Sequence, residues 1–134
     1  MTIYDPSATG RPLNIPEAIA REEGWNLTPT ARCRRNCNPG NLNFEPWEIQ
    51  FGATLEDVPD GETARFAAFP TAIDGFQALV HLCGFPKYKG GTLANLIEAW
   101  APPSDGNNTS AYLANVIRWT GLTADTIIDA YLGV

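Results

Sequence analysis

Proline, glycine and helix-capping residues recur along this 134-residue chain and divide it into short predicted elements. The first helix is the clearest case. Asn14 can cap a helix N-terminus, Pro16 fits the first turn, and Glu17 stands three residues after the cap, as in a capping box. Gly24 suits the left-handed conformation that ends many helices. These signals predict a helix over residues 15–23.

The same kinds of signal predict a loop, a hairpin and four further helices. Residues 1–13, interrupted by Pro6, Gly10 and Pro12, are expected to be loosely ordered. The other predicted elements are a structured loop over 25–46, hairpin strands over 48–55 and 63–69 around a turn at 59–61, and helices over 71–83, over 92–100, from Asn108 or Thr109, and from Thr123. We therefore expect one α+β domain, mostly α, over residues 1–134.

Charge and hydropathy exclude several classes of partner. The net charge of −6 argues against wholesale binding to nucleic acid or to an anionic membrane, because both require a basic surface. The only positive cluster is Arg32, Arg34 and Arg35, which is a local feature. No apolar run approaches the ~18 residues of a membrane-spanning helix, and the first residues do not form a secretory signal.

Three cysteines leave two interpretations open. Cys33, Cys37 and Cys83 are an odd number, so they do not form a disulfide framework. Together with His81 they have the ligand types of a zinc site. Residues 81 and 83 fall in a predicted helix, however, where side chains two positions apart diverge. Buried apolar thiols are the favoured interpretation, and we expect no metal or cofactor.

Two adjacent carboxylates end the first predicted helix. A negative charge is unfavourable at a helix C-terminus. The helical spacing places Glu22 near the middle of the apolar face and Glu23 at its border, with Trp25 available as an apolar wall. A half-buried carboxyl has a raised pKa and can serve as a general acid in glycosidic cleavage. The alternative is a solvated acidic helix end beside Arg21.

The segment after Glu23 contains no Asp or Glu until Glu45. Amides suit sugar hydroxyls and N-acetyl groups because each offers two donors and an acceptor. Asparagine is equally common in turns, so loop formation alone can explain the composition. The asparagines of this segment are Asn26, Asn36, Asn38, Asn41 and Asn43.

Several stretches, in order, resemble known wall-degrading enzymes. AIAREEGWN at 18–26 resembles the catalytic-glutamate helix of soluble lytic transglycosylases and goose-type lysozymes, in the register that matches Glu23. RRNCNPGNL at 34–42 resembles a signature of small lysozyme-like proteins in phages and bacteria. ARFAAFPT at 64–71, DGFQAL at 74–79, and WAPPSD with NNT at 100–109 are similar to later segments of that group. The resemblance covers about residues 14–132 and departs at Cys37, where the group usually has asparagine.

The resemblance implies a lysozyme-like fold, in which a helical lobe and a hairpin lobe flank a glycan groove. It implies cleavage of the β-1,4 bond between N-acetylmuramic acid and N-acetylglucosamine in peptidoglycan, by a monomer that acts on the cell wall. Without a secretory signal, delivery would be by phage-encoded release, by a virion, or from a sequence trimmed of its leader. The residues implied are Glu23 as general acid, Asn38, Gly40 and Asn41 in the groove wall, Tyr112 facing the glutamate, and Asn108 near the sugar unless it only caps a helix.

The sequence leaves open whether the reaction is a hydrolysis or a transglycosylation. If no second carboxylate reaches the groove, Glu23 would act alone with help from the substrate's N-acetyl group. The alternatives are a non-catalytic wall-binding or virion structural module, a chitin-directed glycosidase, and a plain helical interaction domain. The candidate second carboxylates are Glu45, Glu48, Glu56, Asp57, Asp60, Glu62 and Asp105.

Overall fold

Helix α1 (Ile15–Glu22) begins and ends as its sequence signals predict. The computed structural model describes residues 4–8 and 10–133. The side chain of Asn14 accepts a hydrogen bond from the Glu17 amide at 2.9 Å, and the Glu17 carboxylate accepts one from the Asn14 amide at 2.9 Å. Gly24 follows the helix with a φ of +101°. The predicted capping box is therefore confirmed.

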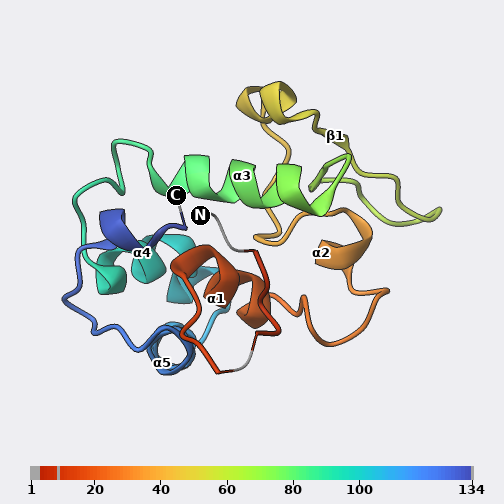
Figure 1. The fold of residues 1–134 in the computed structure, drawn as a ribbon. Helices are drawn as coiled ribbons and strands as arrows, with labels where there is room; N and C mark the ends of the chain where they lie inside the picture. The colour runs from red at the N-terminus through yellow and green to blue at the C-terminus, as the bar shows by residue number, and fades with distance from the viewer. Residues whose placement is uncertain (1–3, 9, 134) are drawn as a thin grey trace.

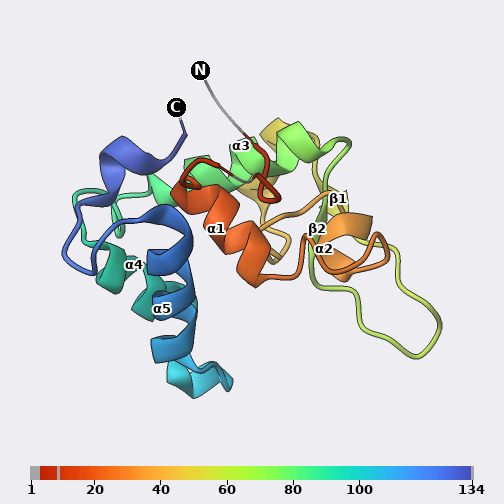
Figure 2. The ribbon, with the colours of Figure 1, turned by 60° about the horizontal axis from the view of Figure 1, so that its bottom comes forward.

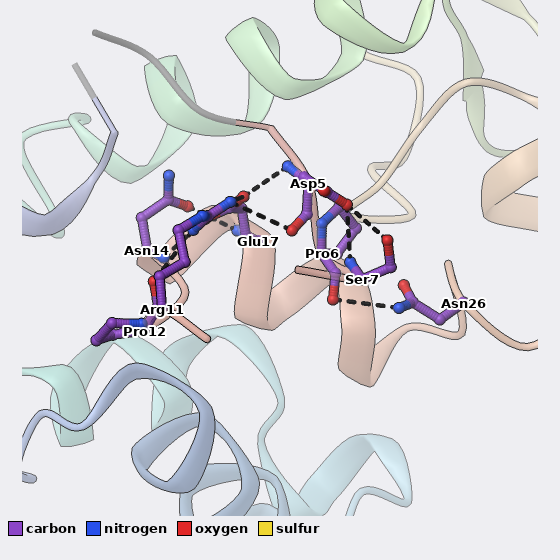
Figure 3. A network of polar contacts seen from close by, with 8 residues as sticks. All are labelled: Asp5, Pro6, Ser7, Arg11, Pro12, Asn14, Glu17 and Asn26. Atoms are coloured by element: carbon purple, nitrogen blue, oxygen red, sulfur yellow. Dashed lines mark hydrogen bonds and ion pairs between the residues drawn. The ribbon is translucent and has the colours of Figure 1, made fainter. Parts of the chain in front are cut away.

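The buried carboxylate of Glu17 also attaches the N-terminal segment to α1 (Figure 3). Arg11 forms an ion pair with it at 2.7 Å, and the amide of Asp5 donates a hydrogen bond at 2.5 Å. The carbonyl of Pro6 accepts a hydrogen bond from Asn26 at 3.1 Å. Loose order was expected over residues 1–13, of which 1–3 and 9 lie outside the described residues.

The loop after α1 contains a helical turn that the sequence patterns did not predict, α2 (Arg32–Arg35). The loop packs closely against the long helix α3 (Ala72–Cys83). A β-carbon placed on Gly75 would lie 1.9 Å from the carbonyl oxygen of Cys37, so only glycine permits this approach. The contact fixes the loop relative to the helical part of the molecule.

The predicted hairpin exists, but its first strand was placed wrongly. Residues Pro46–Phe51 form the 3-10 helix η1, and the paired strands β1 (Thr54–Leu55) and β2 (Ala67–Ala68) have two residues each. Pro46 starts η1, and the Glu48 carboxylate accepts a hydrogen bond from the Glu45 amide. The backbone groups of this segment therefore find hydrogen-bond partners within the segment and need no partner strand. The turn at 59–61 is confirmed by the bond from the Glu62 amide to the Pro59 carbonyl at 3.1 Å.

The later helices largely follow their predicted caps. Thr71, Thr92 and Asn108 cap α3, α4 (Leu93–Trp100) and α5 (Thr109–Thr120) with their side chains. The helix predicted from Thr123 was wrong. The hydroxyls of Thr123 and Thr126 are hydrogen-bonded to each other at 3.1 Å in a turn, and the chain continues into the short 3-10 helix η3 (Ile128–Tyr131). A further 3-10 turn, η2 (Pro103–Asp105), separates α4 from α5.

Helices account for most of the regular secondary structure of the described residues, so the expectation of a mostly helical α+β chain is confirmed. Helices α4 and α5 lie on one side of α1, while α2 and the hairpin lie on the other side, and α3 runs across both (Figures 1 and 2). Within residues 4–8 and 10–133, no helix has the length and apolar character needed to cross a membrane. The core side chains that join the helices include Ile15, Ile19, Phe76, Leu79, Leu96, Ile97 and Val116.

Candidate active site

A groove of about 720 Å³ opens where α1 ends. One wall comes from the loop after α2 and from Arg65 and Phe66, which precede β2, and the other from the end of α4 and the segment that follows it. The groove thus lies between the hairpin side and the helical side of the molecule. Its lining residues are Glu23, Gly40, Asn41, Leu42, Asn43, Arg65, Phe66, Leu82, Tyr88, Ala99, Trp100, Ala101, Asp105 and Asn107.

Glu23 is the half-buried carboxyl of this groove, at the C-cap of α1. Its Oε2 accepts a hydrogen bond from the Tyr112 hydroxyl at 2.9 Å, and its Oε1 accepts one from Asn41 Nδ2 at 3.3 Å. Burial raises the pKa of Glu23, and the nearby Glu22 carboxylate adds to the increase. The two hydrogen bonds act in the opposite direction, because they favour the ionised form, but burial outweighs them.

Asn41 reaches Glu23 because the loop turns sharply at this residue. Its φ is +48°, a left-handed conformation that asparagine tolerates better than most residues. The preceding Gly40 lies so close to the core that an added β-carbon would sit 2.9 Å from Leu79 Cδ1 and 3.2 Å from Trp100 Cζ2. The predicted groove-wall positions of Gly40 and Asn41 therefore agree with where these residues lie.

Asn38, also predicted to lie in the groove wall, is instead fully buried behind it. Its Nδ2 donates hydrogen bonds to the carbonyls of Leu42 and Ala67, both at 2.9 Å, and its Oδ1 accepts one from the Leu42 amide at 2.9 Å. These bonds join the loop to β2. The physical reason for the difference is that a loop crossing the core must satisfy buried backbone groups, and Asn38 does this.

Tyr112 comes from α5, 89 residues after Glu23, and its ring is buried. Burial and the neighbouring Glu23 raise the pKa of the Tyr112 hydroxyl well above its ordinary value. The phenol therefore keeps its proton and acts as a fixed donor to Glu23. The expected position of Tyr112, facing the glutamate, agrees with this geometry.

The predicted contact between Asn108 and a sugar is not supported by its position. Asn108 is exposed, its side chain accepts a hydrogen bond from the Ala111 amide at 3.1 Å, and it is not among the described residues that line the groove. The capping alternative therefore describes this residue. Its neighbour Asn107 does line the groove.

Among the candidate second carboxylates, the structure separates three environments. Glu56 is buried and bound by Arg32 at 2.6 Å and by Asn36 at 3.0 Å, which hold its pKa far below the ordinary range. Glu45 and Glu48 line a neighbouring pocket of about 340 Å³. Of the described groove-lining residues, only Asp105 carries a second carboxyl group.

Sequence patterns did not single out Arg65, Phe66, Tyr88 or Trp100 as groove residues. The stretches containing Arg65, Phe66 and Trp100 carried the family resemblance, and that was the one available signal. Tyr88 follows α3 in a turn rich in glycine and lysine, and nothing in its spacing pointed to a site.

The cysteines do not assemble into a site. Cys33 and Cys83 are buried free thiols, and burial raises the pKa of Cys83 to about 12. In the part of the chain that the structure describes, no group of three or more His, Cys, Asp or Glu residues is arranged to hold a metal ion. The zinc alternative raised by Cys33, Cys37, His81 and Cys83 therefore has no support.

The comparisons with family models and with curated proteins do not assign the chain to a family. No protein-family model matches the chain. No curated protein matches it significantly.

Proposed function

We propose that this protein is a peptidoglycan-cleaving glycosidase, with Glu23 as its general acid and base. The observation that carries the proposal is a half-buried carboxyl in the wall of a groove, held by Asn41 and Tyr112, whose pKa is raised by burial. The resemblance of the Glu23 helix and the following loop to wall-degrading enzymes supplies the substrate class. The proposed partner is a glycan strand of the cell wall, bound by a monomer.

In the first step, the protonated Glu23 carboxyl gives its proton to the oxygen of the scissile glycosidic bond. A raised pKa favours this step because more of the carboxyl is protonated near neutral pH. Two features besides burial discourage ionisation: the Glu22 carboxylate and the C-terminal end of α1. The bond to the leaving sugar then breaks, and positive charge develops at the anomeric carbon.

In the second step, the ionised Glu23 acts as the base. Tyr112 and Asn41 donate hydrogen bonds to its two oxygens and stabilise the carboxylate that the first step leaves behind. The carboxylate can then take a proton from the incoming nucleophile. The same two donors also fix the direction in which the carboxyl group points.

The developing charge has two possible stabilisers. Asp105 shares the groove with Glu23, and the substrate's own 2-acetamido group is the other candidate. We favour the acetamido group, because Glu56 is occupied by Arg32 and Asp105 lies on an exposed 3-10 turn. Water as nucleophile leaves a reducing end, whereas the sugar's 6-hydroxyl gives an anhydro product. Mass spectrometry of digested sacculi distinguishes them, and purely reducing ends would exclude the transglycosylase outcome.

The proposal is tested with purified sacculi and two matched variants. Glu23→Gln keeps the shape of the side chain but cannot donate the proton, so release of soluble saccharides should fall by about 10²–10⁴-fold. Glu98→Gln changes a carboxyl on α4 that is exposed and lies outside the groove lining. It should stay within a few fold of the parent chain.

The alternatives give different results in the same assay. Lytic activity that survives Glu23→Gln would refute the catalytic role, and a chain that binds sacculi without cleaving them would be a binding module. Cleavage of chitin oligomers but not sacculi would indicate the chitin-directed alternative.

A further inference from the structure

Arg65 is the one basic residue among the described residues that line the groove. The structure pairs Arg11 with Glu17 and Arg32 with Glu56, but within residues 4–8 and 10–133 it gives Arg65 no carboxylate partner. A guanidinium that forms no ion pair with a described carboxylate, in a groove that also contains Glu23 and Asp105, is available to an acidic group on a ligand.

The position of Arg65 is well fixed. Its guanidinium carbon lies 4.4 Å from the centre of the Phe66 ring, and the guanidinium of Arg32 also stacks on that ring, at 4.6 Å. The Arg65 carbonyl accepts a hydrogen bond from the Phe44 amide at 2.8 Å, and its amide donates one to the buried Glu56 at 3.0 Å. Because the backbone is held on both sides and the side chain rests on a ring, little order is lost when a ligand binds.

We propose that Arg65 binds a carboxylate carried on the 3-O-lactyl substituent of muramic acid, and so selects peptidoglycan over chitin. This inference rests on the proposed function and names the substrate group that the groove recognises. Chitin has the same N-acetylated backbone but lacks the lactyl substituent. The carboxylate has two sources, the free lactyl group of a peptide-free strand and the first acidic residue of an attached peptide.

The geometry of arginine suits this role. A guanidinium offers two parallel N–H donors to one carboxylate, and it stays charged at all relevant pH values. A lysine offers the charge without the planar pair of donors. The chain as a whole has a net charge of −6, so an anionic substrate gains local attraction only where a basic group lines its path.

The test measures binding in a Glu23→Gln background, so that no substrate is consumed. Dissociation constants are measured by calorimetry for four saccharides of equal length: a peptide-free glycan strand, the same strand with its lactyl carboxyls converted to methylamides, a peptide-bearing strand, and a chitin oligomer. Arg65→Gln and Arg65→Lys are compared with Arg118→Gln. Arg118 also stacks on an aromatic ring, that of Trp119 at 5.6 Å, but it lies outside the groove lining.

With Arg65 present, at least one carboxylate-bearing strand should bind about tenfold or more tightly than the methylamide strand and the chitin oligomer, which is the size expected for a hydrogen-bonded charge pair. Arg65→Gln should remove this preference, Arg65→Lys should restore part of it, and Arg118→Gln should leave it intact. A preference shown only by the peptide-free strand assigns the lactyl carboxylate, and one shown only by the peptide-bearing strand assigns the peptide.

Equal binding of all four saccharides, or equal weakening of all four by Arg65→Gln, would overturn the inference, as would a failure to bind any of them. These outcomes are distinct from failure of the proposed function. That failure would appear in the chain with Glu23 intact, as absence of cleavage, whatever the binding preference of the groove.

Discussion

Replacing Asn38 with alanine should destabilise the fold more than any loop substitution at the surface. The side chain is fully buried and makes three hydrogen bonds of 2.9 Å. Its loss leaves the Leu42 amide without its partner, which lowers the free energy of unfolding by about 1–3 kcal/mol. It also removes two hydrogen bonds to carbonyls, and the loss of each lowers the free energy of unfolding by roughly 0.5–1.5 kcal/mol. The Leu42 carbonyl keeps its bond from the Ala67 amide, so no further penalty is added there, and we expect a total of about 2–6 kcal/mol.

The free energy of unfolding of Asn38→Ala is measured by urea denaturation, followed by far-UV circular dichroism. The control is Asn26→Ala, because Asn26 is exposed and makes one hydrogen bond, to Pro6 at 3.1 Å. This control should cost less than about 1 kcal/mol. If Asn38→Ala were no more destabilising than the control, Asn38 would not be the residue that holds the groove loop to β2.

Three further predictions concern a buried acid, a catalytic partner and a cap. Burial raises the pKa of Glu48 from 4.5 to about 7, so ionisation of Glu48 above that pH lowers the stability of the fold, and the stability returns as the pH falls toward 4.5. Between pH 8 and pH 5, the free energy of unfolding of the parent chain, measured by urea denaturation, should rise by on the order of 3 kcal/mol relative to that of Glu48→Gln. A difference between the two chains that does not change with pH would contradict the raised pKa. Tyr112→Phe removes a donor that favours the ionised Glu23, so the alkaline limb of the kcat/KM profile on sacculi should move to higher pH; a shift to lower pH would argue against this bond. Asn108→Ala should cost about 1 kcal/mol in urea denaturation and leave cleavage of sacculi unchanged, whereas a large loss of cleavage at full stability would place Asn108 at the substrate after all.

Local signals predicted the elements whose ends are set by neighbouring residues. The Asn14–Glu17 capping box and the caps Thr71 and Thr92 each involve contacts within three residues, so the sequence alone contains the necessary information. The predicted position of the first hairpin strand was wrong for a related reason. Residues 48–51 alternate in a way that favours a strand, but Pro46 and the bond between Glu48 and the Glu45 amide stabilise a 3-10 helix instead.

The site was only partly predictable. Glu23 could be proposed from its place at the end of an amphipathic helix, because that geometry depends on nearby residues. Which asparagine of the following loop reaches it could not be derived from composition. Asn38 and Asn41 are chemically identical, and only the path of the loop sends one into the core and the other to Glu23. The contact with Tyr112 spans 89 residues, so its expectation came from resemblance and not from spacing.

In the proposed mechanism, burial keeps the Glu23 carboxyl protonated until a glycosidic oxygen takes its proton. The most direct measurement is a carbon-detected NMR titration of the Glu23 side chain, set against the pH dependence of kcat/KM on sacculi. We expect a Glu23 pKa clearly above 4.5 and an alkaline limb of activity at the same pH. A Glu23 that titrates at or below 4.5, or an activity that falls at a pH unrelated to its titration, would contradict this mechanism.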